Sequence, residues 1–174
     1  VNDPANTGAA GTPSAVAAGD LDGDGLDDLA ITTASSNTLT VLMNRGTLSG
    51  EWQGFEGAVQ FNTGSNPQGV AIGDIDGDGM KDLAIANQGS NSVTLYKNTT
   101  VPLSHAASLS GQGTLATGMG PIGITIENFD GSGTRPVIVT ADELDGGLSI
   151  LIRSSGPGFG FPPRVPKQLP VNFP

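Results

Sequence analysis

The chain has 174 residues, with 17 acidic and 7 basic side chains and a formal net charge of −10. This length suits one ordinary domain or a few small repeats, and the negative charge would repel a nucleic-acid backbone, so no nucleic-acid partner is expected. The absence of cysteine excludes disulfides and Cys-based zinc sites, and no run approaches ~18 apolar residues, so no membrane insertion is expected.

The 27 glycines, 12 prolines and short runs of Val, Ile, Leu and Thr predict an all-β chain with many turns. After a lead-in over residues 1–12, the sequence repeats with a step of 54 residues, which carries Pro13 to Pro67 and then to Pro121. Each repeat contains about four short apolar runs bounded by Gly, Asn and Asp, which predict the four antiparallel strands of one β-propeller blade. The predicted blades are 13–66, 67–120 and 121–174.

The first blade is predicted to join its first two strands, 15–18 and 29–33, through the acidic loop DLDGDGLDD (20–28, loop 1). Alternation turns carboxylates at positions 1, 3, 5 and 9 toward one centre, and this oxygen-only cage suits Ca²⁺ better than Mg²⁺. A solvated acidic turn is the alternative, but carboxylates this crowded repel one another unless a cation binds. The predicted ligands are Asp20, Asp22, Asp24, the backbone carbonyl of Leu26, and Asp28.

Two features separate loop 1 from an EF-hand. Position 12 is Ile31, where an EF-hand has a bidentate Glu, and the flanking segments are strand-like where an EF-hand has helices. Asp27, at position 8, is replaced by Lys81 in the second copy of the loop and is expected to point outward. Two further strands, 39–43 and 58–61, complete the first predicted blade.

The second blade repeats this organisation, with strands predicted over 69–72, 83–86, 92–96 and 113–117. The single histidine, His105, lies in the polar stretch VPLSHAASLSG and is predicted to be a surface residue and not a catalytic base. Asn98 begins an Asn-Thr-Thr glycosylation sequon. In the second acidic loop (74–82, loop 2), the predicted Ca²⁺ ligands are Asp74, Asp76, Asp78, the carbonyl of Met80, and Asp82.

The third blade, with strands predicted over 123–126, 137–140, 148–152 and 168–171, departs from the pattern in its acidic loop (loop 3). Loop 3 has Asn128, Asp130, Ser132 and Thr134 at positions 1, 3, 5 and 7, and Pro136 is assigned to position 9, so weak or no ion binding is expected. The proline-rich end, 156–174, predicts an irregular outer strand or a docking arm. The acidic group Asp142, Glu143 and Asp145 is predicted to be a solvated turn, not a pair of catalytic carboxylates.

The motif G-D-x-D-G-D-G-x-x-D-L-A-I between strands, repeated about every 54 residues, resembles the FG-GAP/VCBS repeats of integrin-α-like β-propellers. The resemblance implies four-stranded blades with Ca²⁺ held between the first two strands, an extracellular or cell-surface location, and a role in adhesion, ligand binding or assembly. Closed propellers use roughly 4–8 blades, so three predict a partial propeller or one completed by oligomerisation. The lead-in 1–12 is similar to the segment FNTG and predicts a strand of a neighbouring blade.

We therefore expect a non-enzymatic, extracellular calcium-binding module with Ca²⁺ in a structural role. Its ligand would be a protein or a glycan, and its exposed blade faces would favour self-association. Two alternatives remain open at this stage: a self-assembling subunit of a surface filament or sheath, and an accessory propeller domain of a secreted enzyme.

Overall fold

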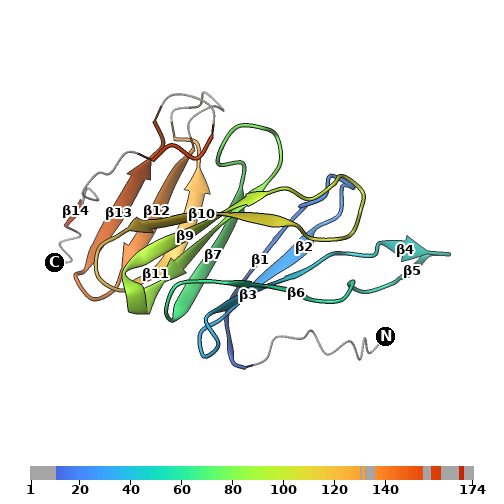
Figure 1. Cartoon of the computed structure of the whole chain (residues 1–174), viewed down its shortest axis with the longest axis horizontal. Helices are drawn as coiled ribbons and strands as arrows, with labels where there is room; N and C mark the ends of the chain where they lie inside the picture. The colour runs from blue at the N-terminus through green and yellow to red at the C-terminus, as the bar shows by residue number, and fades with distance from the viewer. Residues whose placement is uncertain (1–10, 130, 132–135, 155–157, 162–168, 171–174) are drawn as a thin grey trace.

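The computed structural model describes residues 11–129, 131, 136–154, 158–161 and 169–170. In this part of the chain the fold is all-β apart from one 3-10 turn at Gln88–Ser90. Three four-stranded antiparallel sheets follow one another along the chain, and Figure 1 shows them side by side from blue through green to orange. The predicted all-β architecture of blade-type sheets is confirmed, and we call these sheets blades 1, 2 and 3.

Blade 1 has the strand order β1-β2-β3-β6. Between its last two strands the chain makes an extra hairpin, β4–β5, in which Trp52 is 44% exposed and packs edge-on against Phe55. The repeat pattern did not predict this hairpin, because the other two blades have no counterpart in sequence. The strands are β1 (Pro13–Gly19), β2 (Asp28–Thr33), β3 (Thr38–Leu42), β4 (Thr47–Leu48), β5 (Glu51–Trp52) and β6 (Val59–Asn62).

Blade 2 has the order β10-β9-β8-β7, so each strand pairs with the next along the chain. Its outermost strand is longer than predicted and contains a register shift between Gly111 and Thr114. The strands are β7 (Pro67–Gly73), β8 (Asp82–Asn87), β9 (Ser92–Asn98) and β10 (Leu109–Ala116).

Blade 3 shows that the sequence alignment of the third repeat was wrong by one residue. Gly19 pairs with Asp28 and Gly73 with Asp82, whereas Glu127 pairs with Val137, so loop 3 is one residue longer than loops 1 and 2. Position 9 is therefore Val137 and not Pro136. The strands are β11 (Pro121–Glu127), β12 (Val137–Asp142), β13 (Gly147–Ile152) and β14 (Leu169–Pro170), in the order β11-β12-β13-β14.

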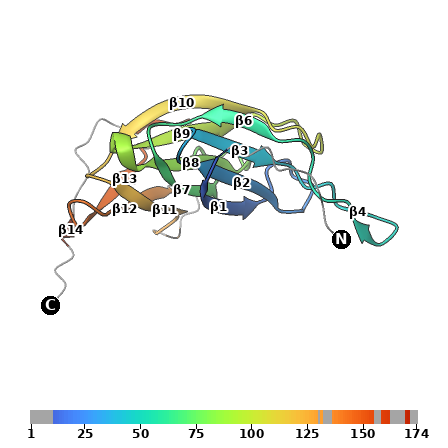
Figure 2. The same ribbon diagram turned by 90° about the horizontal axis from the view of Figure 1, so that it is seen from below.

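The blades pack face to face, with β7 in contact with both β1 and β11. Figure 2 shows these first strands together along one side of the molecule. One apolar core, around Leu39, Val41 and Ile85, lies between blades 1 and 2, and a second, around Leu95 and Ile138, lies between blades 2 and 3. Blade 2 is therefore covered on both faces.

The acidic loops all connect the first and second strands of a blade, so they emerge at the same end of the sheets. The second-to-third strand turns lie at the opposite end, where Gln88 Nε2 donates to Glu143 Oε2 at 2.8 Å and joins blade 2 to blade 3. Among the described residues, nothing helical has the length or apolar character required to cross a bilayer.

Candidate metal centre

Loops 1 and 2 share one tightly curled backbone. Gly23 and Gly25 have φ of 76° and 85°, and Gly77 and Gly79 have φ of 83° and 90°. This left-handed region is costly for residues with a Cβ, so the glycines are required by the curl of the backbone. A Cβ at any of the four would still leave the loop strained, even though Gly23, Gly25 and Gly79 have open space around them.

The carboxylates at positions 1, 3 and 5 hold their own loop together. Asp20 accepts hydrogen bonds from the N–H groups of Gly23 and Gly25, at 2.6 and 3.0 Å. Asp22 accepts a hydrogen bond from Asp24 N–H at 3.2 Å, and Asp24 accepts one from Leu26 N–H at 2.7 Å. Loop 2 makes the same four bonds. These bonds bring several negative charges into a small volume, which is the condition that favours a cation.

The position 9 carboxylate is buried in both loops and connects the loop to the chain just after β3 in blade 1 and to the last residue of β9 in blade 2. Asp28 Oδ2 accepts from Leu21 N–H and Oδ1 accepts from Asn44 N–H, both at 2.8 Å, and Asp82 makes the corresponding pair in blade 2. Burial raises the pKa of Asp28 and brings the pKa of Asp82 to about 6, although these backbone hydrogen bonds act in the opposite direction. A bound cation would favour the ionised form of both groups.

The structure brings most of the predicted ligands together, in a different grouping in each loop. In loop 1, oxygens of Asp20, Asp22 and Asp28 lie within 4.8 Å of one another. In loop 2 the corresponding group is Asp74, Asp76 and Asp78, and it does not include Asp82. The roles of the Leu26 and Met80 carbonyls stay predictions.

Lys97, on β9, places a positive charge inside loop 2. Its Nζ donates to Asp76 Oδ2 and, at 2.7 Å, to Asp78 Oδ2. These hydrogen bonds raise the pKa of Lys97. Partial burial acts to raise the pKa of Asp78, but the hydrogen bond from Lys97 acts in the opposite direction and the pKa of Asp78 is lowered. The ammonium stands where the loop carboxylates would hold a cation, and the oxygen-only donor set fits a hard ion such as Ca²⁺.

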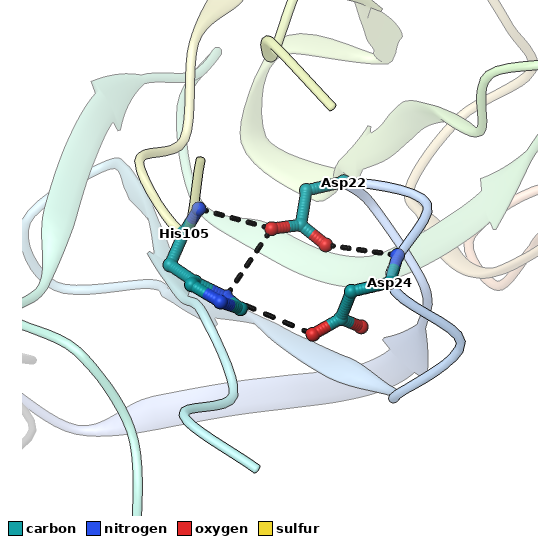
Figure 3. Close-up of side chains that lie close together, drawn as sticks. All are labelled: Asp22, Asp24 and His105. Carbon is teal, nitrogen blue, oxygen red and sulfur yellow. Dashed lines mark hydrogen bonds and ion pairs between the residues drawn. The ribbon is translucent and has the colours of Figure 1, made fainter. Parts of the chain in front are cut away.

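His105 was predicted to be a surface residue and its side chain is 38% exposed, but it also lies against loop 1, which the sequence did not predict. Figure 3 shows its ring and its backbone nitrogen facing the carboxylates of Asp22 and Asp24. Nδ1 is 3.3 Å from Asp22 Oδ2 and 3.7 Å from Asp24 Oδ2, and the three residues form a second group able to hold a metal. Sequence reasoning missed His105 and Lys97 because both reach the loops from distant segments. The one available signal was a lone basic or imidazole side chain in an otherwise uncharged stretch.

Among its described residues, loop 3 differs from the other two loops at position 9. Its position 9 residue, Val137, cannot accept the hydrogen bonds that Asp28 and Asp82 accept. The predicted positions Asp130, Ser132 and Thr134 lie outside the described residues. Weak or absent ion binding at loop 3 therefore stays a prediction.

Asp142 was wrongly predicted to lie in a solvated turn. It is the last residue of β12 and is buried, and its carboxylate accepts from Thr140 Oγ1 at 2.8 Å and Ser149 Oγ at 2.5 Å. The neighbouring Glu143 and Asp145 are exposed. Asp142 therefore fixes the β12–β13 hairpin and is separate from the acidic loops.

Comparison with known proteins gives a family match for the segment that contains loops 1 and 2. Residues 20–85 match the family model described as an FG-GAP-like repeat. The match begins at the first carboxylate of loop 1 and ends in β8, after loop 2, and it confirms the resemblance to FG-GAP repeats. No curated protein matches the chain.

Proposed function

We propose that this chain, which carries an FG-GAP-like repeat over residues 20–85, is a calcium-stabilised β-propeller-type module that works outside the cell by binding or assembly and not by catalysis. The observation that carries the proposal is the crowding of carboxylates in loops 1 and 2, where loop 2 already holds the ammonium of Lys97. Millimolar extracellular calcium would suit sites of modest affinity, about 10⁻⁴–10⁻³ M.

The proposed role of Ca²⁺ is structural. Asp28 and Asp82 connect each loop to the end of the third strand of its blade, so an ion held by the loop would fix three strands at once. The ion would also offset the repulsion among the carboxylates, which otherwise opposes folding. Its ligands would be Asp20, Asp22, Asp24 and Asp28 in loop 1, and Asp74, Asp76, Asp78 and Asp82 in loop 2.

The experiment is thermal unfolding of the full chain in 10 mM CaCl₂ and in excess chelator. A site with a Kd of about 10⁻⁴ M contributes about 2.7 kcal/mol at one hundred times Kd, or a rise in Tm of roughly 5–10 °C. Asp20→Asn should remove part of this rise, whereas Asp27→Asn, at the exposed position 8, should leave it unchanged. An equal Tm with and without calcium would overturn the structural role.

Self-association is the second candidate function, favoured by the outer faces of blades 1 and 3. Val16 is 64% exposed and lies opposite Ile31 on the face of blade 1 that points away from blade 2. The corresponding Val70 of blade 2 is buried against blade 1. On the far side of the molecule, Ile152 of blade 3 is 49% exposed. The face of blade 1 that carries Val16 is therefore exposed to solvent, whereas the corresponding face of blade 2, which carries Val70, packs against blade 1.

The molar mass in solution tests self-association. Light scattering in millimolar calcium should give a mass above 17.4 kDa that rises with concentration. Val16→Asp should lower that mass, while Val101→Asp, at an exposed position in the β9–β10 connection of blade 2, should not. A constant monomer mass for the unsubstituted chain would rule out assembly through these faces.

A further inference from the structure

We infer that loop 1 is a mixed nitrogen and oxygen metal site, in which His105 joins Asp22 and Asp24 to bind a divalent transition metal such as Zn²⁺. The inference rests on the proposed cation-binding function of loop 1, because Asp22 and Asp24 belong to both sites. The two ions would therefore compete for the same carboxylates.

The first argument is the position of the imidazole nitrogen. His105 Nδ1 is shielded from solvent and makes no hydrogen bond of acceptable geometry, although it lies 3.3 and 3.7 Å from two carboxylate oxygens. Two ligand atoms about 2.05 Å from one tetrahedral ion are about 3.3 Å apart, so the separation from Asp22 suits a shared ion, and Asp24 would have to approach by about 0.4 Å. A buried nitrogen without a hydrogen bond is costly, and coordination would satisfy it.

The second argument is that the backbone fixes the imidazole against loop 1. Leu103 N–H donates to the carbonyl of Asp22 at 2.9 Å, and His105 N–H donates to Asp22 Oδ2 at 3.0 Å. Asp22 is itself fully buried. The connection from β9 to β10 is thus attached twice to one predicted ligand, and the nitrogen is held beside the carboxylates before any ion binds (Figure 3).

The third argument is the chemistry of the donors. Carboxylates and carbonyls favour Ca²⁺ and Mg²⁺, whereas a neutral imidazole favours zinc, copper and nickel. Loop 2 has the same carboxylates but faces the ammonium of Lys97, which has no lone pair to donate. Only loop 1, among the described loops, combines carboxylates with an imidazole, so the two loops should differ in metal preference.

The test is titration of the tag-free, calcium-free full chain with Zn²⁺, followed by calorimetry and by ¹⁵N NMR of labelled histidine. His105 is the one histidine of the sequence, so any imidazole signal is unambiguous. Zn²⁺ should shift the Nδ1 resonance, and excess Ca²⁺ should reduce the apparent zinc affinity. His105→Ala should weaken zinc binding at least tenfold and change calcium binding less than threefold.

Two variants keep the test decisive. Asp24→Asn, which leaves the imidazole in place, should also weaken zinc binding about tenfold, and Asp27→Asn, which removes a neighbouring charge, should not. Calcium binding with a zinc affinity unaffected by His105→Ala would overturn the zinc site alone. If the unsubstituted chain binds no calcium but binds zinc in a way that depends on His105, the proposed calcium function would be overturned and this inference would stand.

Discussion

At the scale of single residues, the carboxylate at position 9 shows how one side chain serves both fold and site. Both oxygens of Asp28 accept backbone hydrogen bonds, and the group is buried. In Asp28→Asn the side-chain NH₂ group would face one of the two backbone N–H donors, so that donor would lose its acceptor. We expect the free energy of unfolding to fall by about 1–3 kcal/mol in urea, even without calcium. Asp27→Asn is the matched control, and an equal loss there would contradict this account.

Lys97 provides the second residue-scale prediction, because a divalent ion entering loop 2 must displace its ammonium from Asp76 and Asp78. The corresponding residue of blade 1 is Met43, so Lys97→Met copies the chain's own alternative. Partly exposed ion pairs contribute up to about 1 kcal/mol, so calcium affinity at loop 2 should rise about fivefold. Calorimetry in an Asp20→Asn background isolates loop 2. An unchanged affinity would show that the lysine does not compete.

At the scale of elements, the end of β9 joins blade 2 to blade 1. Asn98 is 2% exposed, and its Nδ2 donates to the carbonyls of Leu21 at 2.7 Å and Lys81 at 2.9 Å. Its Oδ1 accepts from Thr100 N–H at 2.9 Å. The amide of the predicted glycosylation sequon is therefore used inside the folded chain, where a glycan would have no room.

Asn98→Ala removes all three bonds and leaves the loop carbonyls without that donor. We expect a loss of about 2–4 kcal/mol in the free energy of unfolding, measured by urea denaturation, and a lower calcium affinity at both loops. Gln112→Ala, on the exposed strand β10, is the control and should stay within about 0.5 kcal/mol of the parent. A loss as small as the control's would mean that Asn98 does not couple the blades.

The strands and the acidic loops could be predicted because each is encoded by consecutive residues. The pattern failed in blade 3, where Val137, Ile138 and Val139 are all apolar and give no alternation to fix the register. A slip of one residue reverses the two faces of a strand, and only the pairing of Glu127 with Val137 resolves it. Lys97 could not be predicted at loop 2, because its position depends on how β9 pairs with β8. His105 could not be predicted at loop 1, because its position depends on the path of the chain after β9 and on how blade 2 packs against blade 1.

At the scale of the whole molecule, the spacing between blades depends on a close backbone approach. A Cβ at Gly69 would lie 2.6 Å from the carbonyl oxygen of Ile122 and 3.1 Å from Ile124 Cγ2. Gly69→Ala must therefore push β7 and β11 apart, and we expect a loss of about 1–3 kcal/mol by urea unfolding. Gly57→Ala, which meets nothing within 4 Å, should have little effect. Equal stability of the two variants would contradict tight packing between blades.

The crossing of the β9–β10 connection onto loop 1 also bears on how the protein is synthesised. The chain emerges from the ribosome with its N-terminus first, so the carboxylates of loop 1 appear long before His105 and Asn98, which hold the loop from outside. A nascent chain that stops after residue 66 contains every aspartate of loop 1 and neither of these later partners. Loop 1 of the first repeat therefore gains these two contacts only after the second repeat has been made, and we expect blade 1 to be completed during synthesis by the blade that follows it.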